Sequence, residues 1–137
     1  MATETTAPAQ FALPPAGSFE LIRAVEEGLP TECLQRLKDW GLTFTEVAQL
    51  ILPPRTLKHR KARGERLSPD ETERFLRVMR VLELGERVFG KREKLLNWLR
   101  SPDPEMGDRS SMSLIRTAPG AERVTEQLWA IAEGFAS

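Results

Sequence analysis

The residues best suited to chemistry form one basic segment, which runs from Pro54 to Arg66. Six of its residues are Lys or Arg, and Glu65 is its one acidic residue. Elsewhere acidic and basic residues are mixed, so that 20 Lys and Arg balance 20 Asp and Glu over the 137 residues. Cations gathered in one place on a neutral protein attract phosphate groups. We therefore interpret the segment as a binding site for a nucleic-acid backbone.

Residues that could catalyse a reaction are few. His59 is the only histidine and Cys33 the only cysteine of the chain. Asp103, Glu105 and Asp108 share one segment, yet no Gly-rich phosphate loop, zinc-ligand spacing or nucleophile motif accompanies them. We predict that the chain is not an enzyme, that it needs no cofactor or metal, and that Cys33 packs as a small apolar residue.

The composition indicates a helical protein of the cytoplasm. One cysteine allows no internal disulfide, no apolar run approaches the ~18 residues that cross a bilayer, and the first residues lack a secretory signal. Tyr is absent and β-branched residues do not alternate with polar ones, so the fold class is predicted to be all-α. Residues 1–17, rich in Ala, Thr and Pro, are predicted to form a flexible tail.

Capping residues and helix breakers divide the rest of the chain into helices. Ser18 is placed to cap the first helix, and Thr43 with Glu46 and Ser68 with Glu71 have the spacing of capping boxes. Glycines and prolines mark the ends of the helices. The predicted helices cover residues 19–27, 31–40, 44–51, 54–63, 69–89, 91–100 and 119–133, with a loop at 101–111, a short turn at 112–117 and a tail after Gly134.

The order of the N-terminal helices is that of a helix-turn-helix. Residues 43–51 match the supporting helix, and residues 54–63 match the recognition helix, with Leu57 as its apolar anchor. A run of Lys and Arg is usually a solvated helix face, but its position here favours contact with DNA. The side chains left to face the duplex are Arg55, Thr56, Lys58, His59, Lys61 and Arg63.

Short motifs over most of the chain resemble the antitoxins of the Xre/MbcA/ParS type, the partners of RES-domain toxins in type II toxin–antitoxin systems. They keep their order and spacing from about Gly28 to the C-terminus. Where the family usually shows two glycines, a basic residue and a proline, this chain has Gly107-Asp108-Arg109-Ser110-Ser111. The matching motifs are Arg55-Thr56-Leu57 with the basic residues after it, Arg66-Leu67-Ser68-Pro69-Asp70-Glu71, Phe89-Gly90, Asn97-Trp98-Leu99, Leu114-Ile115-Arg116-Thr117, Gly120-Ala121-Glu122-Arg123-Val124 and Glu133-Gly134.

The resemblance implies that the two parts of the chain bind different partners. Residues 18–67 are expected to hold the helix-turn-helix and to bind DNA and form a dimer, and residues 68–137 to bind the toxin. The antitoxin is expected to cover the toxin's active site, and the antitoxin and toxin together are expected to repress their shared operon. RES toxins degrade NAD, so NAD belongs to the chemistry of the partner. The expected partners are a RES-domain toxin, operator DNA and a second copy of the chain in a larger assembly, without a membrane.

Toxin contacts are expected from the C-terminal motifs and the chain end. Trp98 is predicted to pack in the core, whereas Trp129 is predicted to face the toxin because Leu128 beside it must point elsewhere. The apolar residues Leu21, Ile22, Val25 and Leu29 suit either a dimer interface or the chain's own core. The predicted toxin-binding residues are Arg109, Ser111, Met112, Arg116, Trp129, Phe135, Ala136 and Ser137.

Two other functions fit parts of the sequence. A plain helix-turn-helix regulator or scaffold would use the same basic helix and bind a different protein through its C-terminal half. A small enzyme would need a set of catalytic residues that the sequence does not offer. Copurification with a toxin encoded by the neighbouring gene distinguishes the antitoxin from the regulator.

Overall fold

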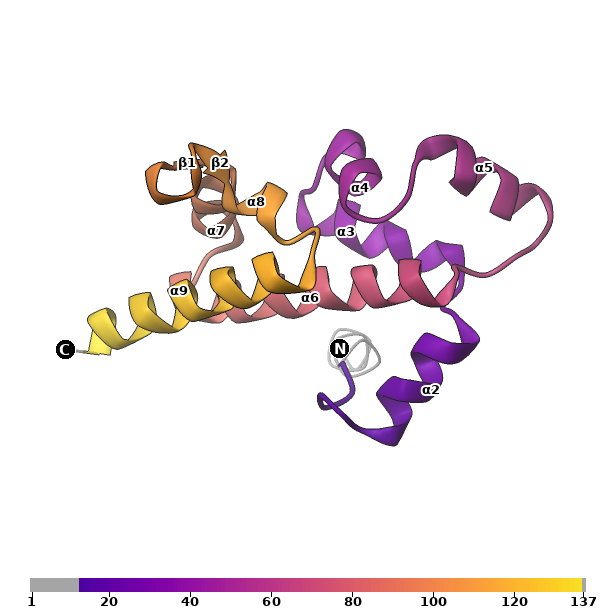
Figure 1. Ribbon diagram of the computed structural model, residues 1–137, viewed down its shortest axis with the longest axis horizontal. Helices are drawn as coiled ribbons and strands as arrows, with labels where there is room; N and C mark the ends of the chain where they lie inside the picture. The colour runs from indigo at the N-terminus through magenta and orange to yellow at the C-terminus, as the bar shows by residue number, and fades with distance from the viewer. Residues whose placement is uncertain (1–12, 137) are drawn as a thin grey trace, which may run out of the picture.

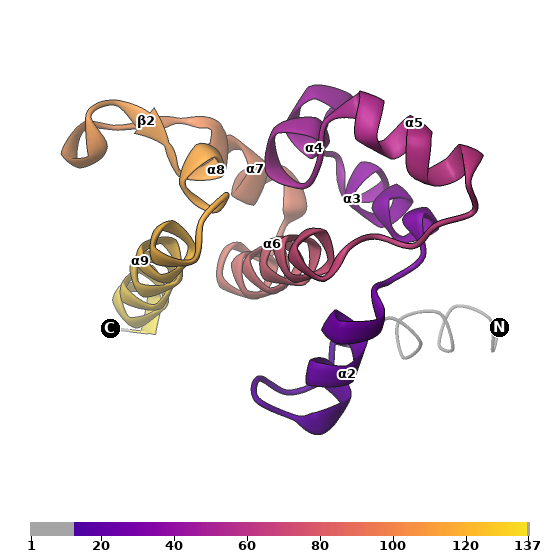
Figure 2. The same cartoon turned by 45° about the vertical axis from the view of Figure 1, so that its right-hand side comes forward.

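A long helix, α6 (Pro69–Phe89), is the element on which the other helices pack. In the computed structural model, which describes residues 13–136, α6 runs through the molecule beside α9 (Ala118–Ala136). Figures 1 and 2 show α2 on one side of α6 and the helices α3, α4 and α5 on the opposite side. α6 starts at the predicted capping box, in which Ser68 Oγ accepts from the Glu71 amide and the Glu71 carboxylate accepts from the Ser68 amide.

The N-terminal helices follow the predicted order. They are α2 (Phe19–Glu27), the 3₁₀ turn η1 (Thr31–Leu34) that continues into α3 (Gln35–Trp40), α4 (Phe44–Leu50) and α5 (Pro54–Ala62). Ser18 caps α2, and the Thr43–Glu46 capping box opens α4. Gly41 ends α3 with a φ of 112°, a left-handed conformation that glycine adopts without steric cost. The predicted starts of these helices are thus confirmed.

The C-terminal part returns the chain along α6. α7 (Arg92–Arg100) leads into a short antiparallel pair, β1 (Pro102–Asp103) and β2 (Arg109–Ser110), in which Pro102 pairs with Ser110 and Asp103 with Arg109. The 3₁₀ turn η2 (Pro104–Met106) connects these two strands. α8 (Ser111–Leu114) then turns the chain into α9.

One continuous apolar core joins the two halves of the chain. α6 contributes buried side chains to it from several turns, and α9 contributes Val124 and Leu128. Trp98 is half-buried against this core, with its ring centroid 5.7 Å from that of Phe89, as predicted. Fully buried side chains include Leu37, Ile51, Phe75, Val78, Met79, Leu82, Leu95, Leu99, Ile115, Val124 and Leu128.

Three predictions need correction in the C-terminal part. The expected loop at 101–111 contains β1, η2 and β2, because the segment is fixed by hydrogen bonds that the sequence pattern does not reveal. The expected turn at 112–117 includes the short helix α8. α9 runs past Gly134 to Ala136, so Phe135 and Ala136 belong to a helix and not to a tail. Gly134 is exposed and meets no neighbour, and a glycine lowers helix stability by only about 1 kcal/mol relative to Ala.

The predicted flexible tail lies mostly outside the described residues. Residues 1–12 and Ser137 are not described, and residues 13–17 have no regular secondary structure beyond a turn. Leu13 packs against the core, and the carbonyl oxygen of Pro14 accepts a hydrogen bond from Arg80. Within residues 13–136, no helix combines the length and the apolar character that a membrane span requires.

Candidate nucleic-acid interface and protein-binding surface

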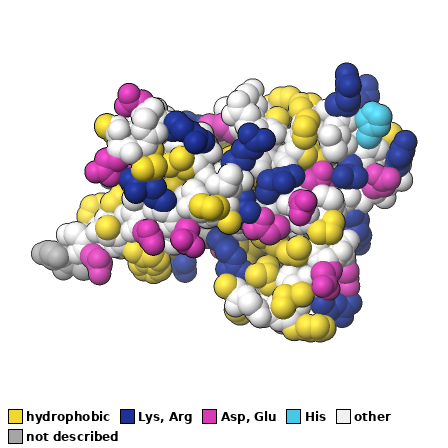
Figure 3. Space-filling view, in the orientation of Figure 1, with side chains coloured by type: hydrophobic (Ala, Val, Ile, Leu, Met, Phe, Trp, Pro, Cys, Tyr) yellow, Lys and Arg dark blue, Asp and Glu magenta, His cyan; other side chains and the backbone are white. Residues whose placement is uncertain are grey.

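α5 presents most of the basic segment to solvent. Its start is set by Pro53, which is extended, and by Pro54, which occupies the first turn. Leu57 is half-buried against the core, as predicted for an anchor. Thr56 is half-buried, and the side chains of Arg55, Lys58, His59, Lys61 and Arg63 are exposed. Figure 3 shows Lys and Arg side chains around the single histidine at this end of the molecule.

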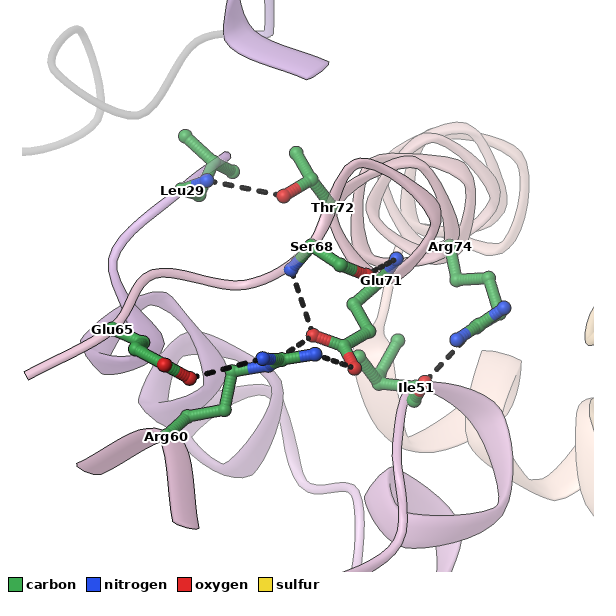
Figure 4. Close-up of polar contacts among 8 residues, drawn as sticks. All are labelled: Leu29, Ile51, Arg60, Glu65, Ser68, Glu71, Thr72 and Arg74. Carbon is green, nitrogen blue, oxygen red and sulfur yellow. Dashed lines mark hydrogen bonds and ion pairs between the residues drawn. The ribbon is translucent and has the colours of Figure 1, made fainter. Parts of the chain in front are cut away.

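Two of the six basic residues serve the fold. Arg60 donates from Nε and Nη2 to the two carboxylate oxygens of Glu71 in α6, at 2.9 and 3.0 Å, and from Nη1 to Glu65 at 3.2 Å (Figure 4). Arg66 donates to the carbonyl oxygen of Gly28 at 3.0 Å. The other four, Arg55, Lys58, Lys61 and Arg63, have no hydrogen-bond or ion-pair partner among residues 13–136, so their charges remain available for a ligand.

The Glu71 carboxylate is buried but stays ionised. Burial alone raises its pKa, yet hydrogen bonds from Arg60 and Ser68 outweigh that effect and hold the pKa below its ordinary value. The same carboxylate closes the α6 capping box, so it joins the start of α6 to the middle of α5. This link fixes the direction in which α5 projects from the fold.

Two further bonds attach the α4–α5 pair and the chain before it to α6. Arg74 donates from Nε to the carbonyl oxygen of Ile51, just before the turn into α5, at 2.9 Å. Thr72 accepts from the Leu29 amide at 3.1 Å (Figure 4). α5 is therefore held at the turn before it by Arg74 and along its length by Arg60, so its exposed face has a fixed position for a rigid partner.

The predicted toxin-binding residues around α8 divide into exposed and buried groups. Arg109 and Arg116 are exposed, whereas Ser111 and Met112 are buried. Ser110 caps α8 by accepting from the Ser113 amide at 3.2 Å. In this conformation Ser111 and Met112 hold the segment against the core, while the two arginines are accessible.

On α9 the neighbouring residues Leu128 and Trp129 point in different directions. Leu128 is 0 % exposed within the core, whereas Trp129 is 55 % exposed. Phe135 is exposed too, although its ring lies 6.5 Å from that of Phe89 in an edge-on arrangement. Ala136 continues α9, and Ser137 lies outside the described residues. α9 thus offers two large aromatic side chains to a partner.

Asp103 and Glu105, in the segment between α7 and α8, have structural contacts. Asp103 accepts from the Glu105 amide and from Gln127 of α9, and these bonds lower the pKa of Asp103 below its ordinary value. Arg123 of α9 pairs with Glu105 at 3.0 Å and with Asp103 at 3.8 Å. These contacts attach the β1–β2 pair to α9, and they give Asp103 and Glu105 a structural role.

Cys33 packs as a boundary residue. It is half-buried against the core, and burial raises the pKa of its thiol to about 12. The thiol is therefore neutral at physiological pH and a poor nucleophile.

Sequence reasoning missed the arginines that join distant segments of the chain. Besides Arg60 and Arg74, Arg77 donates to the carbonyl oxygen of Arg116 at 2.7 Å, and Arg100 pairs with Glu46 at 2.8 Å. The partners lie far apart in the chain, so no local pattern could have predicted them.

Comparisons with known proteins match both halves of this arrangement. A family model described as the antitoxin Xre-like helix-turn-helix domain matches residues 20–80, and one described as the antitoxin Xre/MbcA/ParS C-terminal toxin-binding domain matches residues 84–134. An antitoxin Xre of Pseudomonas putida is 32 % identical over 120 residues, which cover 88 % of this chain and 76 % of the relative. An antitoxin Xre of Yersinia enterocolitica is 27 % identical over 131 residues, or 93 % and 88 % of the two chains. The chain therefore belongs to the Xre antitoxins, with an Xre-like helix-turn-helix domain followed by a C-terminal toxin-binding domain.

Proposed function

We propose that this antitoxin neutralises a RES-type, NAD-degrading toxin by covering its active site. The observation that carries the proposal is Trp129, a large aromatic side chain that α9 exposes beside the fully buried Leu128. An exposed Trp on a helix fixed by core packing is a typical interface anchor, because the helix gives the ring a defined position before binding. Phe135 extends the same helix end and adds apolar area. Neutralisation then needs no chemistry from the antitoxin itself.

The same proposal assigns repression of the operon to α5. Support comes from Arg55, Lys58, Lys61 and Arg63, which have no ion-pair partner among the described residues, and from the fixed direction of the helix. Phosphate contacts supply affinity, and side chains near the start of α5 reach the base edges. The helix-turn-helix family match supports a nucleic-acid partner.

A homodimer completes this proposal. Helix-turn-helix proteins usually read paired half-sites as dimers. Of the predicted contacts, Leu21, Val25 and Leu29 are half-buried against the chain's own core, and Ile22 is exposed. Phe19 is exposed on α2 as well. We assign the dimer contact to Phe19 and Ile22, since they are the large apolar side chains that α2 exposes.

Co-expression with the neighbouring RES-type gene tests the toxin half of the proposal. Growth and cellular NAD are expected to recover with the intact antitoxin and to fall again with Trp129→Ala or with residues 135–137 deleted. Removal of all residues after 110 is a poor test, because it takes Val124 and Leu128 out of the core. Full rescue by a chain that lacks both Trp129 and residues 135–137 would contradict the assignment of the toxin contact to this helix end.

A harmless neighbour, or an antitoxin that fails to restore growth, would refute the RES assignment. A plain regulator is then the better description, and binding of DNA without copurification of the neighbouring protein would establish it.

A further inference from the structure

A cleft separates α4 from the segment formed by β2 and α8. It consists of two adjoining hollows of about 450 and 660 Å³ that share Gln49, Arg109, Ser113 and Arg116. Arg100 and Glu46 line the smaller hollow, and Arg74 lines the larger one. We call this feature the arginine cleft, because four arginines and one acidic residue line it.

The charge of the arginine cleft is suited to an anion. Glu46 is already paired with Arg100, whose hydrogen bond lowers the pKa of the Glu46 carboxyl below its ordinary value. Arg109 makes a single long hydrogen bond, 3.4 Å from Nη2 to the Ser113 carbonyl oxygen. The Arg116 guanidinium has no hydrogen-bond or ion-pair partner among residues 13–136. Two guanidinium groups thus retain most of their donors, and guanidinium groups bind phosphate with paired hydrogen bonds.

The arginine cleft opens beside the start of α5. Ile51, Leu52 and Pro53, which form the turn between α4 and α5, line its larger hollow. In a helix-turn-helix the start of the recognition helix enters the major groove, so phosphates of the flanking backbone pass close to this turn. Figure 3 shows Lys and Arg side chains on one face of the molecule, from the region of β2 and α8 to α5.

Both walls of the arginine cleft are fixed to α6. Arg74 holds the α4–α5 turn through the Ile51 carbonyl oxygen at 2.9 Å, and Arg77, one helical turn later, holds the opposite wall through the Arg116 carbonyl oxygen at 2.7 Å. The two arginines of the C-terminal part therefore keep a constant position relative to α5. Such a frame suits a rigid ligand that touches both.

We propose that Arg109 and Arg116 bind backbone phosphates of the DNA duplex whose major groove receives α5. The proposal rests on DNA binding by α5, and it extends the DNA contact into the toxin-binding domain. It also reassigns two residues that the sequence resemblance placed in the toxin contact. Duplex DNA is favoured over an acidic protein surface because the cleft carries excess positive charge and adjoins the turn of the helix-turn-helix.

The test is the salt dependence of DNA binding by the full chain. The probes are a duplex taken from upstream of the protein's own gene and a random duplex of equal length. The double variant Arg109→Ala/Arg116→Ala is expected to lower the slope of log affinity against log salt by about two units on both probes. Arg109→Lys/Arg116→Lys is expected to retain most of the slope, since it keeps the charges. The double variant Arg87→Ala/Lys94→Ala, at two exposed basic residues away from the arginine cleft, is the charge-matched control and is expected to leave the slope unchanged.

Each other outcome has a distinct meaning. An unchanged slope for the double variant, while Lys58→Ala lowers it, overturns the arginine proposal and leaves DNA binding by α5 intact. Absence of salt-dependent DNA binding by the unmodified chain refutes both the arginine proposal and DNA binding by α5. Loss of toxin copurification with an unchanged slope assigns the two arginines to the toxin instead. Thermal unfolding of each variant confirms that the comparison is made between folded proteins.

Discussion

Arg60 of α5 and Glu71 of α6 form an ion pair with two hydrogen bonds, in which each carboxylate oxygen accepts from a different guanidinium nitrogen. The Glu71 side chain is 8 % exposed and that of Arg60 is 25 % exposed, so water screens the pair poorly. Paired hydrogen bonds of this kind set an orientation as well as a distance. The most central cation of the basic segment thus positions α5 and is not available to a phosphate.

Arg60→Ala is expected to destabilise the fold by about 1–3 kcal/mol, because it leaves a buried carboxylate without its charged partner. Lys58→Ala, two residues earlier, is expected to change stability by no more than about 0.5 kcal/mol. Urea unfolding measures both values. The effects on DNA binding are expected to differ in the opposite way. Lys58→Ala lowers the slope of log affinity against log salt by about one unit, whereas Arg60→Ala weakens binding and leaves that slope unchanged. A slope that falls equally in both variants would identify Arg60 as a phosphate contact.

Stability is expected to fall in acid because of Glu46 and Glu71. The folded-state pKa of each carboxyl lies below its ordinary value. For Glu46 the main cause is the hydrogen bond from Arg100. For Glu71 burial raises the pKa, but the hydrogen bonds from Arg60 and Ser68 outweigh that effect. The unfolded chain therefore binds protons first, so both groups stabilise the fold above about pH 4.5 and lose that effect as the pH falls through the folded pKa.

The double variant Glu46→Gln/Glu71→Gln provides the check on this pH dependence. Its free energy of unfolding is expected to be lower at pH 7 and to vary less between about pH 5 and 2 than that of the unmodified chain. Denaturant unfolding at a series of pH values measures it. Parallel curves for the two proteins would show that other carboxyls govern acid unfolding.

Leu128 and Trp129 offer a matched pair of variants on adjacent residues. Leu128→Ala is expected to destabilise by about 2–5 kcal/mol, because it leaves a cavity in the core. Trp129→Ala is expected to alter stability little and to weaken toxin binding at least tenfold, in line with about 2 kcal/mol for an interface anchor. Thermal unfolding and a binding titration with the toxin separate the two effects. A Trp129→Ala variant of full affinity would show that the toxin binds elsewhere.

Gly120 and Gly134 lie in the same helix but differ in their surroundings. A Cβ at Gly120 would stand 1.8 Å from the Leu114 carbonyl oxygen, so Gly120→Ala is expected to shift α8. The expected loss of stability is several times the ~1 kcal/mol by which Gly and Ala differ in helix propensity. A Cβ at Gly134 meets nothing within 4 Å, and Gly134→Ala is expected to stabilise by up to about 1 kcal/mol. Thermal unfolding measures both changes, and a stable Gly120→Ala variant would show that the α8–α9 turn yields easily.

Much of the fold could be predicted because its signals are local. Ser18, Thr43 and Ser68 lie next to the helices they cap, and the apolar residues between them recur at helical spacing. The division of α9 into a buried and an exposed side also followed from adjacent residues, as the exposure of Trp129 beside Leu128 shows.

What escaped prediction depends on contacts between distant residues. Strands of two residues are too short for an alternating pattern, and the β1–β2 pair is held by Gln127 and Arg123, which lie on α9. The left-handed conformation of Asp108, with a φ of 64°, occurs where the sequence resemblance led us to expect a second glycine. Asp adopts this conformation more readily than most residues do, so the turn persists without the glycine. The arginine cleft likewise appears only once α4 and α8 are folded against α6.

The anchors on α6 are concentrated in its first three turns, at Glu71, Thr72, Arg74 and Arg77, and they serve both halves of the chain. The halves therefore do not behave as interchangeable modules. A hybrid that joins the helix-turn-helix of one antitoxin to the toxin-binding region of another inherits a single α6. This helix must then match the Arg60 guanidinium and the Ile51 carbonyl oxygen from one parent and the Arg116 carbonyl oxygen from the other. New toxin specificities within this architecture are thus expected to arise by changes on the outer face of α9 more readily than by recombination of whole halves.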